Sequence, residues 1–141
     1  MAEDIYKATI QYAGDDFFIG TTPSGHALTV DTNADRKSAP TPMEMLLVSV
    51  AACTAADVVS ILEKKRQKIS AYRVEIEGER RSDFPRAFTK FRIRHVVRGR
   101  GISAPAVAAA IELSDTKYCS VAATVRPTAT IETSFEIVED Q

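Results

Sequence analysis

The sequence predicts an α+β fold in which antiparallel sheets wrap around one long central helix. Three observations lead to this prediction. Residues 42–66 are apolar or small almost throughout, the segments before and after them alternate between apolar and polar residues, and turn-forming residues separate the alternating segments. The expected element order is βββ-α-ββ-α-β, folded as a single domain over residues 1–141.

The N-terminal part of the chain is expected to form three strands joined by tight turns. They cover residues 4–13, 17–22 and 26–32. The first strand alternates with period two, and the sequences GDD and TPSG between the strands are typical of turns. We therefore expect an antiparallel meander, followed by a loop at residues 31–41 that is rich in Asp, Asn, Ser and Pro.

Residues 42–66 are expected to form the long helix. Thr41 is a suitable N-cap, Pro42 suits the first helical position, and Glu44 completes a capping box. Because the helix is apolar around most of its circumference, we expect the rest of the fold to enclose it. Asp57 disfavours a membrane span, since a carboxylate at the centre of a bilayer costs about 2.5–3.5 kcal/mol on insertion scales.

The second half of the chain predicts a hairpin, a shorter helix and a last strand. Residues 72–81 and 88–99 alternate on either side of the turn sequence RSDFPRA. Ser103 is a suitable N-cap for the second helix, which should end near Cys119. Residues 128–140 alternate again, and we expect antiparallel pairing throughout.

Composition indicates an ordinary globular protein without a nucleic-acid footprint. The chain has 45% hydrophobic and 26% charged residues and a net charge of −1. Its first residues carry acids where a signal peptide would carry bases, so we expect a cytoplasmic location with both cysteines as thiols. His26 and His95 fall in predicted strands without close ligand pairs, and on spacing we expect no metal site.

Cys53, in the middle of the long helix, is the candidate for chemistry. Apolar surroundings raise the pKa of a thiol, and Asp57, one turn later, would raise it further. A reactive Cys53 therefore needs a cation from another segment, and the candidates are Arg36, just before the helix, and Arg126, just after Cys119. Without such a cation, Cys53 is a packing residue.

Several motifs together resemble the OsmC/Ohr superfamily of osmotically inducible and organic-hydroperoxide-resistance proteins. The resemblance covers nearly the whole chain and rests on Pro42, Glu44, Leu46, Leu47, Ala51, Ala52 and Cys53 in the helix, Gly78, Glu79, Arg80, Pro85 and Phe88 in the hairpin, and residues 118–121. It implies an intertwined homodimer of the OsmC-like branch and a two-cysteine thiol peroxidase. By position, Cys53 would be the peroxidatic thiol and Cys119 the resolving thiol.

The same resemblance implies which molecules the protein meets and where it departs from the family. The substrate would be an organic or lipid hydroperoxide, and an external dithiol, with no bound cofactor, would reduce the disulfide again. In the hydroperoxide-resistance branch a Glu directly follows the helix-opening Pro and holds the activating Arg. Here Met43 occupies that position and Glu44 follows, turned by about 100° around the helix. Glu44 and Arg36 are therefore expected only as supporting residues.

Two other functions are compatible with the sequence. Neither Met43 nor Asp57 would stabilise the thiolate form of Cys53. This favours a non-catalytic dimer that binds a small apolar or thiol-containing ligand beside Cys53. In the last alternative both cysteines only pack in a structural scaffold.

Overall fold

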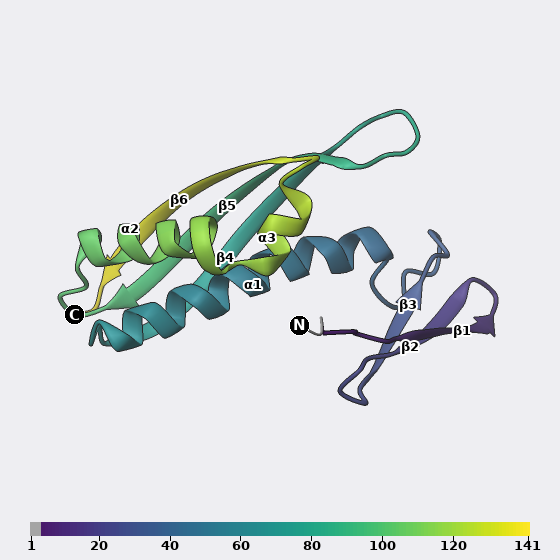
Figure 1. The fold of residues 1–141 in the computed structure, drawn as a ribbon, viewed down its shortest axis with the longest axis horizontal. Helices are drawn as coiled ribbons and strands as arrows, with labels where there is room; N and C mark the ends of the chain where they lie inside the picture. Colours follow the sequence, from purple (N-terminus) through teal and green to yellow (C-terminus); the bar gives the residue numbers. More distant parts are fainter. Residues whose placement is uncertain (1–3) are drawn as a thin grey trace. The chain divides into compact units, whose positions relative to one another are not determined.

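The computed structural model describes residues 4–141. Contacts divide the chain into two compact units, one ending at Leu46 and one beginning at Leu47. The elements are β1 (Thr9–Gly14), β2 (Phe17–Thr21), β3 (Ala27–Asp31), α1 (Pro42–Lys64), β4 (Ile69–Arg80), β5 (Phe88–Gly99), α2 (Ala104–Leu113), a π-helical turn (Ser114–Tyr118), α3 (Ser120–Val125) and β6 (Thr130–Glu139) (Figure 1). The predicted α+β class and element order are confirmed, while the π-helical turn and α3 were not predicted.

The N-terminal unit contains the predicted meander. Strands β1, β2 and β3 pair antiparallel in that order, although β1 begins only at Thr9. The predicted capping box opens α1: the Thr41 amide donates to Glu44 Oε1 at 3.0 Å, and the Glu44 amide donates to Thr41 Oγ1 at 3.2 Å. This reciprocal pair satisfies two amides that the first helical turn leaves without partners.

The C-terminal unit contains a second sheet of order β4-β5-β6. Strands β4 and β5 form the predicted antiparallel hairpin, but β6 runs parallel to β5, from the Lys90–Thr130 pair to the Gly99–Glu139 pair. The expectation of antiparallel pairing throughout was therefore wrong for β6. The segment with α2 and α3 is long enough to carry the chain back to the end of the sheet where β5 began, as a parallel crossover requires.

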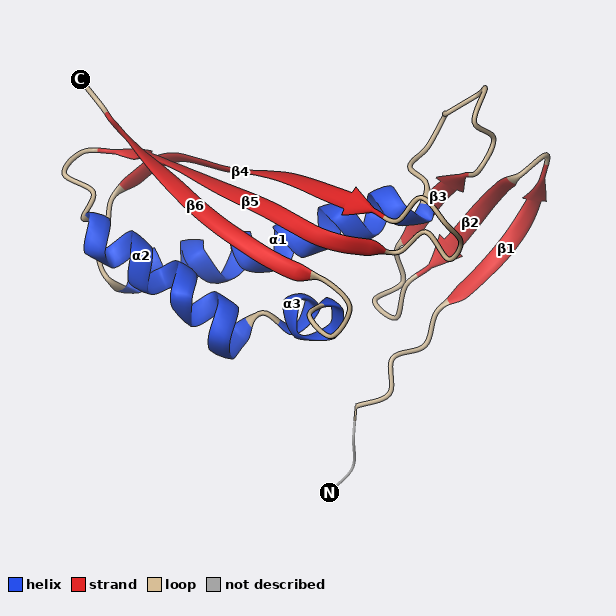
Figure 2. Cartoon of the chain, turned by 90° about the horizontal axis from the view of Figure 1, so that it is seen from above, coloured by secondary structure: helices blue, strands red, loops and turns tan. Residues whose placement is uncertain are grey.

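The helices of this unit lie on one face of the β4-β5-β6 sheet (Figure 2). The central core cluster joins the last turns of α1 to α2 and β5, through Val58, Leu62, Val97, Ile102, Val107, Ala110 and Ile111. Gly78 on β4 belongs to this packing, because a Cβ there would lie 2.6 Å from Phe88 Cε1 and 3.1 Å from Leu47 Cδ1. A glycine at this position lets α1 and Phe88 approach the strand closely.

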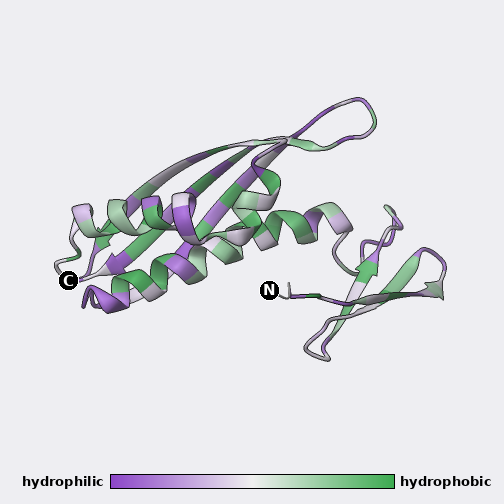
Figure 3. Cartoon of the chain, in the orientation of Figure 1, coloured by the Kyte–Doolittle hydropathy of each residue, from purple (hydrophilic) through white to green (hydrophobic). Residues whose placement is uncertain are grey.

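Helix α1 is enclosed by its own chain along one stripe only. Val50, Thr54, Val58 and Leu62, each one turn apart, are buried, whereas Val48 is 64% exposed and Ala52 and Ala56 are exposed as well. Figure 3 shows that hydrophobic residues nevertheless occur all along the helix. The prediction that the fold encloses α1 was therefore wrong for the single chain. By length and composition alone α1 also qualifies as a membrane span, a test that core helices of soluble proteins pass too.

A half-buried tyrosine on β4 pairs with a buried histidine on β5. Tyr72 Oη is 2.6 Å from His95 Nδ1, and His95 is fully buried. Its Nε2 atom has no hydrogen-bond partner among residues 4–141. Burial lowers the pKa of His95 to about 4 and raises the pKa of Tyr72, because the charged form of each group loses its hydration. The pair is therefore neutral in the folded protein at neutral pH.

We expect this histidine to make the protein less stable in mild acid. Below pH 6.5 His95 binds a proton in the unfolded chain, whereas in the folded chain it binds one only near pH 4, so acid favours unfolding. The free energy of unfolding falls by about 3 kcal/mol at most between these two pH values. Urea unfolding of the native chain and of His95→Gln, which cannot titrate there, measures it. Parallel stability–pH curves for the two proteins would contradict the expectation.

Candidate functional site: two thiols and a carboxylate

Helix α1 places Cys53 and Asp57 one turn apart on the same face. Cys53 is half-buried, and its position comes from the regular helix alone. Thr54, the next residue, is part of the buried stripe. The helix therefore presents a thiol and a carboxylate together, with a buried hydroxyl beside them.

A π-helical turn positions the second thiol. The Cys119 amide donates to the Ser114 carbonyl at 2.8 Å, a bond that spans five residues and ends the turn after α2. Cys119 then becomes the N-cap of α3, where its Sγ accepts the Ala122 amide at 3.4 Å. Its side chain is 5% exposed. The chain therefore turns sharply at the residue that carries the thiol.

Ser114 connects this turn to α1. Its Oγ lies 2.9 Å from Asp57 Oδ2 and 3.0 Å from Thr54 Oγ1, and the residue is fully buried. Both oxygens lie within reach as acceptors of the Ser114 hydroxyl, which has one proton, and the Asp57 carboxylate is the stronger acceptor of the two. These contacts orient the Asp57 carboxylate and hold the two segments in register.

The structure thereby brings Cys53, Asp57 and Cys119 together. One ligand atom from each, two sulfurs and a carboxylate oxygen, lie within 4.8 Å of one another, and both cysteines are free thiols. We call these three residues the thiol–carboxylate cluster. Burial raises the pKa of Cys119 to about 11, with a further contribution from Cys53, although the Ala122 amide acts in the opposite direction. Cys119 is therefore protonated at neutral pH.

The candidate arginines each bind aspartates. In the N-terminal unit, the Arg36 guanidinium donates to both carboxylate oxygens of Asp31, at 2.8 and 2.9 Å, and to Asp15 Oδ2 at 2.7 Å. This pairing holds the pKa of the buried Asp31 carboxyl well below its usual range. Arg126, next to α3, donates to the Asp115 carbonyl at 2.7 Å, and its guanidinium lies 3.8 Å from the Asp115 carboxylate.

The observed contacts of Arg36 and Glu44 are structural and do not require that either residue takes part in the chemistry of Cys53. Arg36 orders the loop before α1, and Glu44 caps the helix within the same unit. That either residue assists Cys53 stays a prediction. Sequence reasoning did not single out Ser114, because only the folded chain brings its hydroxyl to Asp57. Two signals in the sequence pointed to the cluster: the spacing of Cys53 and Asp57, four residues apart, and the family resemblance, which paired Cys53 with Cys119.

A hollow opens beside Asp57. The residues that line it come from α1 and the turn after it, the end of α2 and the π-helical turn: Asp57, Ser60, Ile61, Lys64, Lys65, Leu113 and Tyr118. Its walls are partly apolar and its rim carries two cations. Since the Asp57 carboxylate lies within 4.8 Å of both sulfurs, the hollow leads to the edge of the thiol–carboxylate cluster.

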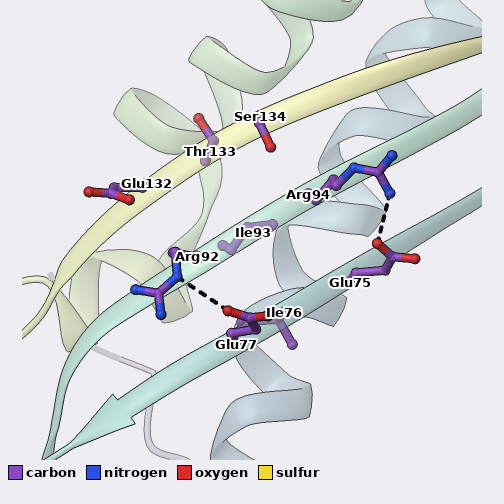
Figure 4. Close-up of a pocket in the computed structure, with 9 residues that line it drawn as sticks. All are labelled: Glu75, Ile76, Glu77, Arg92, Ile93, Arg94, Glu132, Thr133 and Ser134. Carbon is purple, nitrogen blue, oxygen red and sulfur yellow. Dashed lines mark hydrogen bonds and ion pairs between the residues drawn. The ribbon is translucent and has the colours of Figure 1, made fainter.

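A broader hollow lies on the opposite, outer face of the β4-β5-β6 sheet (Figure 4). Its polar side chains pair with one another: Arg94 with Glu75 at 2.9 Å, and Arg92 with Glu77 at 3.2 Å. Exposed pairs of this kind contribute little to stability. Neither Asp57 nor either cysteine lines this hollow, so it is separate from the candidate site.

Comparison with known proteins agrees with the fold. The OsmC-like protein family matches residues 34–134. Protein YhfA of Escherichia coli K12 is 44% identical over 121 residues, 86% of this chain and 90% of YhfA. A hypothetical protein from Aquifex aeolicus VF5 has a TM-score of 0.88 at 29% identity, covering 99% of this chain and 100% of that one. An organic hydroperoxide resistance protein OsmC from Legionella pneumophila shares the fold at 13% identity, with a TM-score of 0.71 over 96% and 99% of the two chains. This chain belongs to the OsmC-like protein family.

Proposed function

We propose that the protein reduces organic or lipid hydroperoxides, with Cys53 as the peroxidatic thiol and Cys119 as the resolving thiol. The observation that carries the proposal is that the two sulfurs lie within 4.8 Å of each other although they belong to different segments. Membership of the OsmC-like family supports a redox role for such a pair. The similarity of the fold to a hydroperoxide resistance protein is consistent with this role.

The environments of the two thiols support their separate roles. Cys53 is half-buried, so a hydroperoxide that enters the cluster meets it before the buried Cys119. A pKa of about 11 keeps Cys119 protonated and therefore a poor nucleophile toward peroxide at neutral pH. The apolar wall of the hollow beside Asp57, formed by Ile61, Leu113 and Tyr118, suits the organic part of such a substrate.

The proposed cycle has three steps. The Cys53 thiolate attacks the outer peroxide oxygen, the O–O bond breaks, and the alkoxide takes a proton to leave as an alcohol, so that Cys53 becomes a sulfenic acid. The Cys119 sulfur then attacks the Cys53 sulfur, and the hydroxyl leaves as water with the Cys119 proton. An external dithiol reduces the resulting disulfide by exchange. The Asp57 carboxylate lies within 4.8 Å of both sulfurs, so it can pass the Cys119 proton on to the leaving hydroxyl in the second step.

Oxidation of the native protein tests this proposal. We expect reduced protein treated with one equivalent of cumene hydroperoxide to lose both thiols and to form a Cys53–Cys119 disulfide, which peptide mass analysis identifies. Hydrogen peroxide at the same concentration is the matched control for substrate class and should react more slowly. The proposal is wrong if Cys53 stays reduced under excess cumene hydroperoxide.

We also propose that two copies of the chain associate through the exposed side of α1. This side of the helix has a solvent-exposed apolar strip, formed by Val48, Ala52 and Ala56. Exposed apolar strips commonly mark protein interfaces. The small alanines would let a second copy approach closely, in line with the intertwined dimer implied by the family. Sedimentation velocity of native protein and of Ala56→Glu, which puts a charge in the strip, distinguishes a dimer from a monomer.

One observation favours a second function, a non-catalytic OsmC-like dimer that binds a small apolar or thiol-containing ligand. A carboxylate beside two thiols opposes thiolate formation, and the pKa of Cys119 is already raised. The pH dependence of Cys53 alkylation separates the two functions. A Cys53 pKa near or below 7 supports the peroxidase, and one well above the free value of about 8.5 supports the ligand-binding protein. The cytoplasmic location, for either function, stays a prediction.

A further inference from the structure

We propose that the reduced thiol–carboxylate cluster binds a thiophilic divalent cation, with Zn²⁺ as the best fit, through Cys53, Cys119 and Asp57. Two sulfurs and a carboxylate oxygen within 4.8 Å of one another are a ligand set that Zn²⁺ uses. The proposal goes beyond hydroperoxide reduction, because it assigns the same three side chains a second ligand.

The distances require only a small adjustment. In a tetrahedral site with Zn–S bonds of about 2.3 Å, two sulfurs lie about 3.8 Å apart. The ligand atoms now lie within 4.8 Å, so they need to move together by about 1 Å at most. Cys53 and Asp57 are on one helix, and rotation of their side chains supplies such a movement without a change in the backbone.

Ser114 provides the support that zinc ligands usually have. It is fully buried and donates to Asp57 Oδ2 at 2.9 Å, which fixes the orientation of the carboxylate toward the two sulfurs. Its contact with Thr54 Oγ1, at 3.0 Å, fixes the hydroxyl in turn. Partners of this kind orient a ligand and raise metal affinity, which makes Ser114 a positioning residue.

The electrostatics of the cluster also favour a cation. Two thiolates and the Asp57 carboxylate would bring three negative charges close together, because their ligand atoms lie within 4.8 Å of one another. A divalent cation bound between them would neutralise most of that charge. The three ligands would leave the fourth position of a tetrahedral site to water or a small molecule.

Metal binding and disulfide formation exclude each other, because they use the same two sulfurs. If the proposed function holds, one hydroperoxide takes two electrons from the thiolates and two protons from solvent. The products are the disulfide, an alcohol, water and the released cation. The binding itself does not depend on this reaction.

Cobalt titration of untagged, fully reduced protein tests the site. We expect one Co²⁺ per chain, with sulfur-to-cobalt charge-transfer absorption that Zn²⁺ abolishes. Cys119→Ser should lose about half of this absorption, and Ser114→Ala should weaken binding by roughly 10- to 100-fold. Asp115→Asn, which changes a nearby aspartate outside the cluster, is the matched control and should bind like the native chain.

The metal site is wrong if reduced native protein shows no charge-transfer absorption with Co²⁺. It is also wrong if Cys53→Ser and Cys119→Ser show the same absorption as the native protein. A third contradicting result is equal cobalt binding by reduced native protein and by native protein whose two thiols have been oxidised to the disulfide with diamide. Oxidised native protein needs no substitution, so it decides the matter even where a variant fails to fold. Thiol oxidation by cumene hydroperoxide is measured separately without metal. Cobalt binding without thiol oxidation contradicts only the proposed hydroperoxide reduction, and thiol oxidation without cobalt binding contradicts only the proposed metal site.

Discussion

Cys53→Ser is expected to lower the consumption of cumene hydroperoxide in excess dithiol by roughly a thousand-fold or more, because a hydroxyl cannot replace the attacking sulfur. The remaining thiol does not substitute for it. Cys119 is buried, and its pKa of about 11 leaves almost no thiolate at neutral pH. The rate of hydroperoxide loss, followed by a colorimetric peroxide assay, measures the effect.

Ala108→Ser is the matched control for this variant. It places the same hydroxymethyl group on a helix, at an exposed position of α2 outside the thiol–carboxylate cluster and outside the apolar strip of α1. We expect it to retain the native rate, and thermal unfolding followed by circular dichroism shows whether both variants fold. A Cys53→Ser protein that is folded and still consumes hydroperoxide at the native rate would remove Cys53 from the mechanism.

Cys119→Ser is expected to oxidise once and then fail to recover. Cys53 should react with hydroperoxide as in the native protein, but no second thiol lies ready to form the disulfide. Excess peroxide then carries the sulfenic acid on to sulfinic acid, which a dithiol does not reduce. Mass spectrometry should therefore show a gain of about 16 Da per added oxygen at Cys53, in place of the loss of about 2 Da that a disulfide gives.

Serine is the right replacement at this position because Cys119 also caps α3. Its side chain accepts the Ala122 amide, and serine is a good N-cap, whereas Cys119→Ala should cost about 1 kcal/mol of stability. A comparison of the two variants separates the chemical role of the sulfur from its structural role. If Cys119→Ser ran through many turnovers under excess peroxide without sulfinic acid, Cys119 would not be the resolving thiol.

The sequence by itself determined those parts of the protein that depend on neighbouring residues. The alternating segments were correctly predicted as strands, and Thr41 with Glu44 correctly marked the start of α1. Ser103 likewise caps α2, with its Oγ accepting the Ala106 amide at 3.2 Å. Capping and alternation act over a few residues, so their physical causes are visible in a short stretch of chain.

Only the tertiary structure decided the direction of β6, the exposed side of α1 and the place of Ser114 beside Asp57, next to the two cysteines that the family resemblance implied. The π-helical turn carries Cys119 to Cys53 and lets Ser114 reach Asp57, and neither meeting is visible in the spacing of the sequence. Arg36 was singled out for its charge, yet Asp31 and Asp15 bind it in the folded unit. Burial and long-range contacts set the protonation and partners of a side chain, and both arise only when distant segments pack against each other.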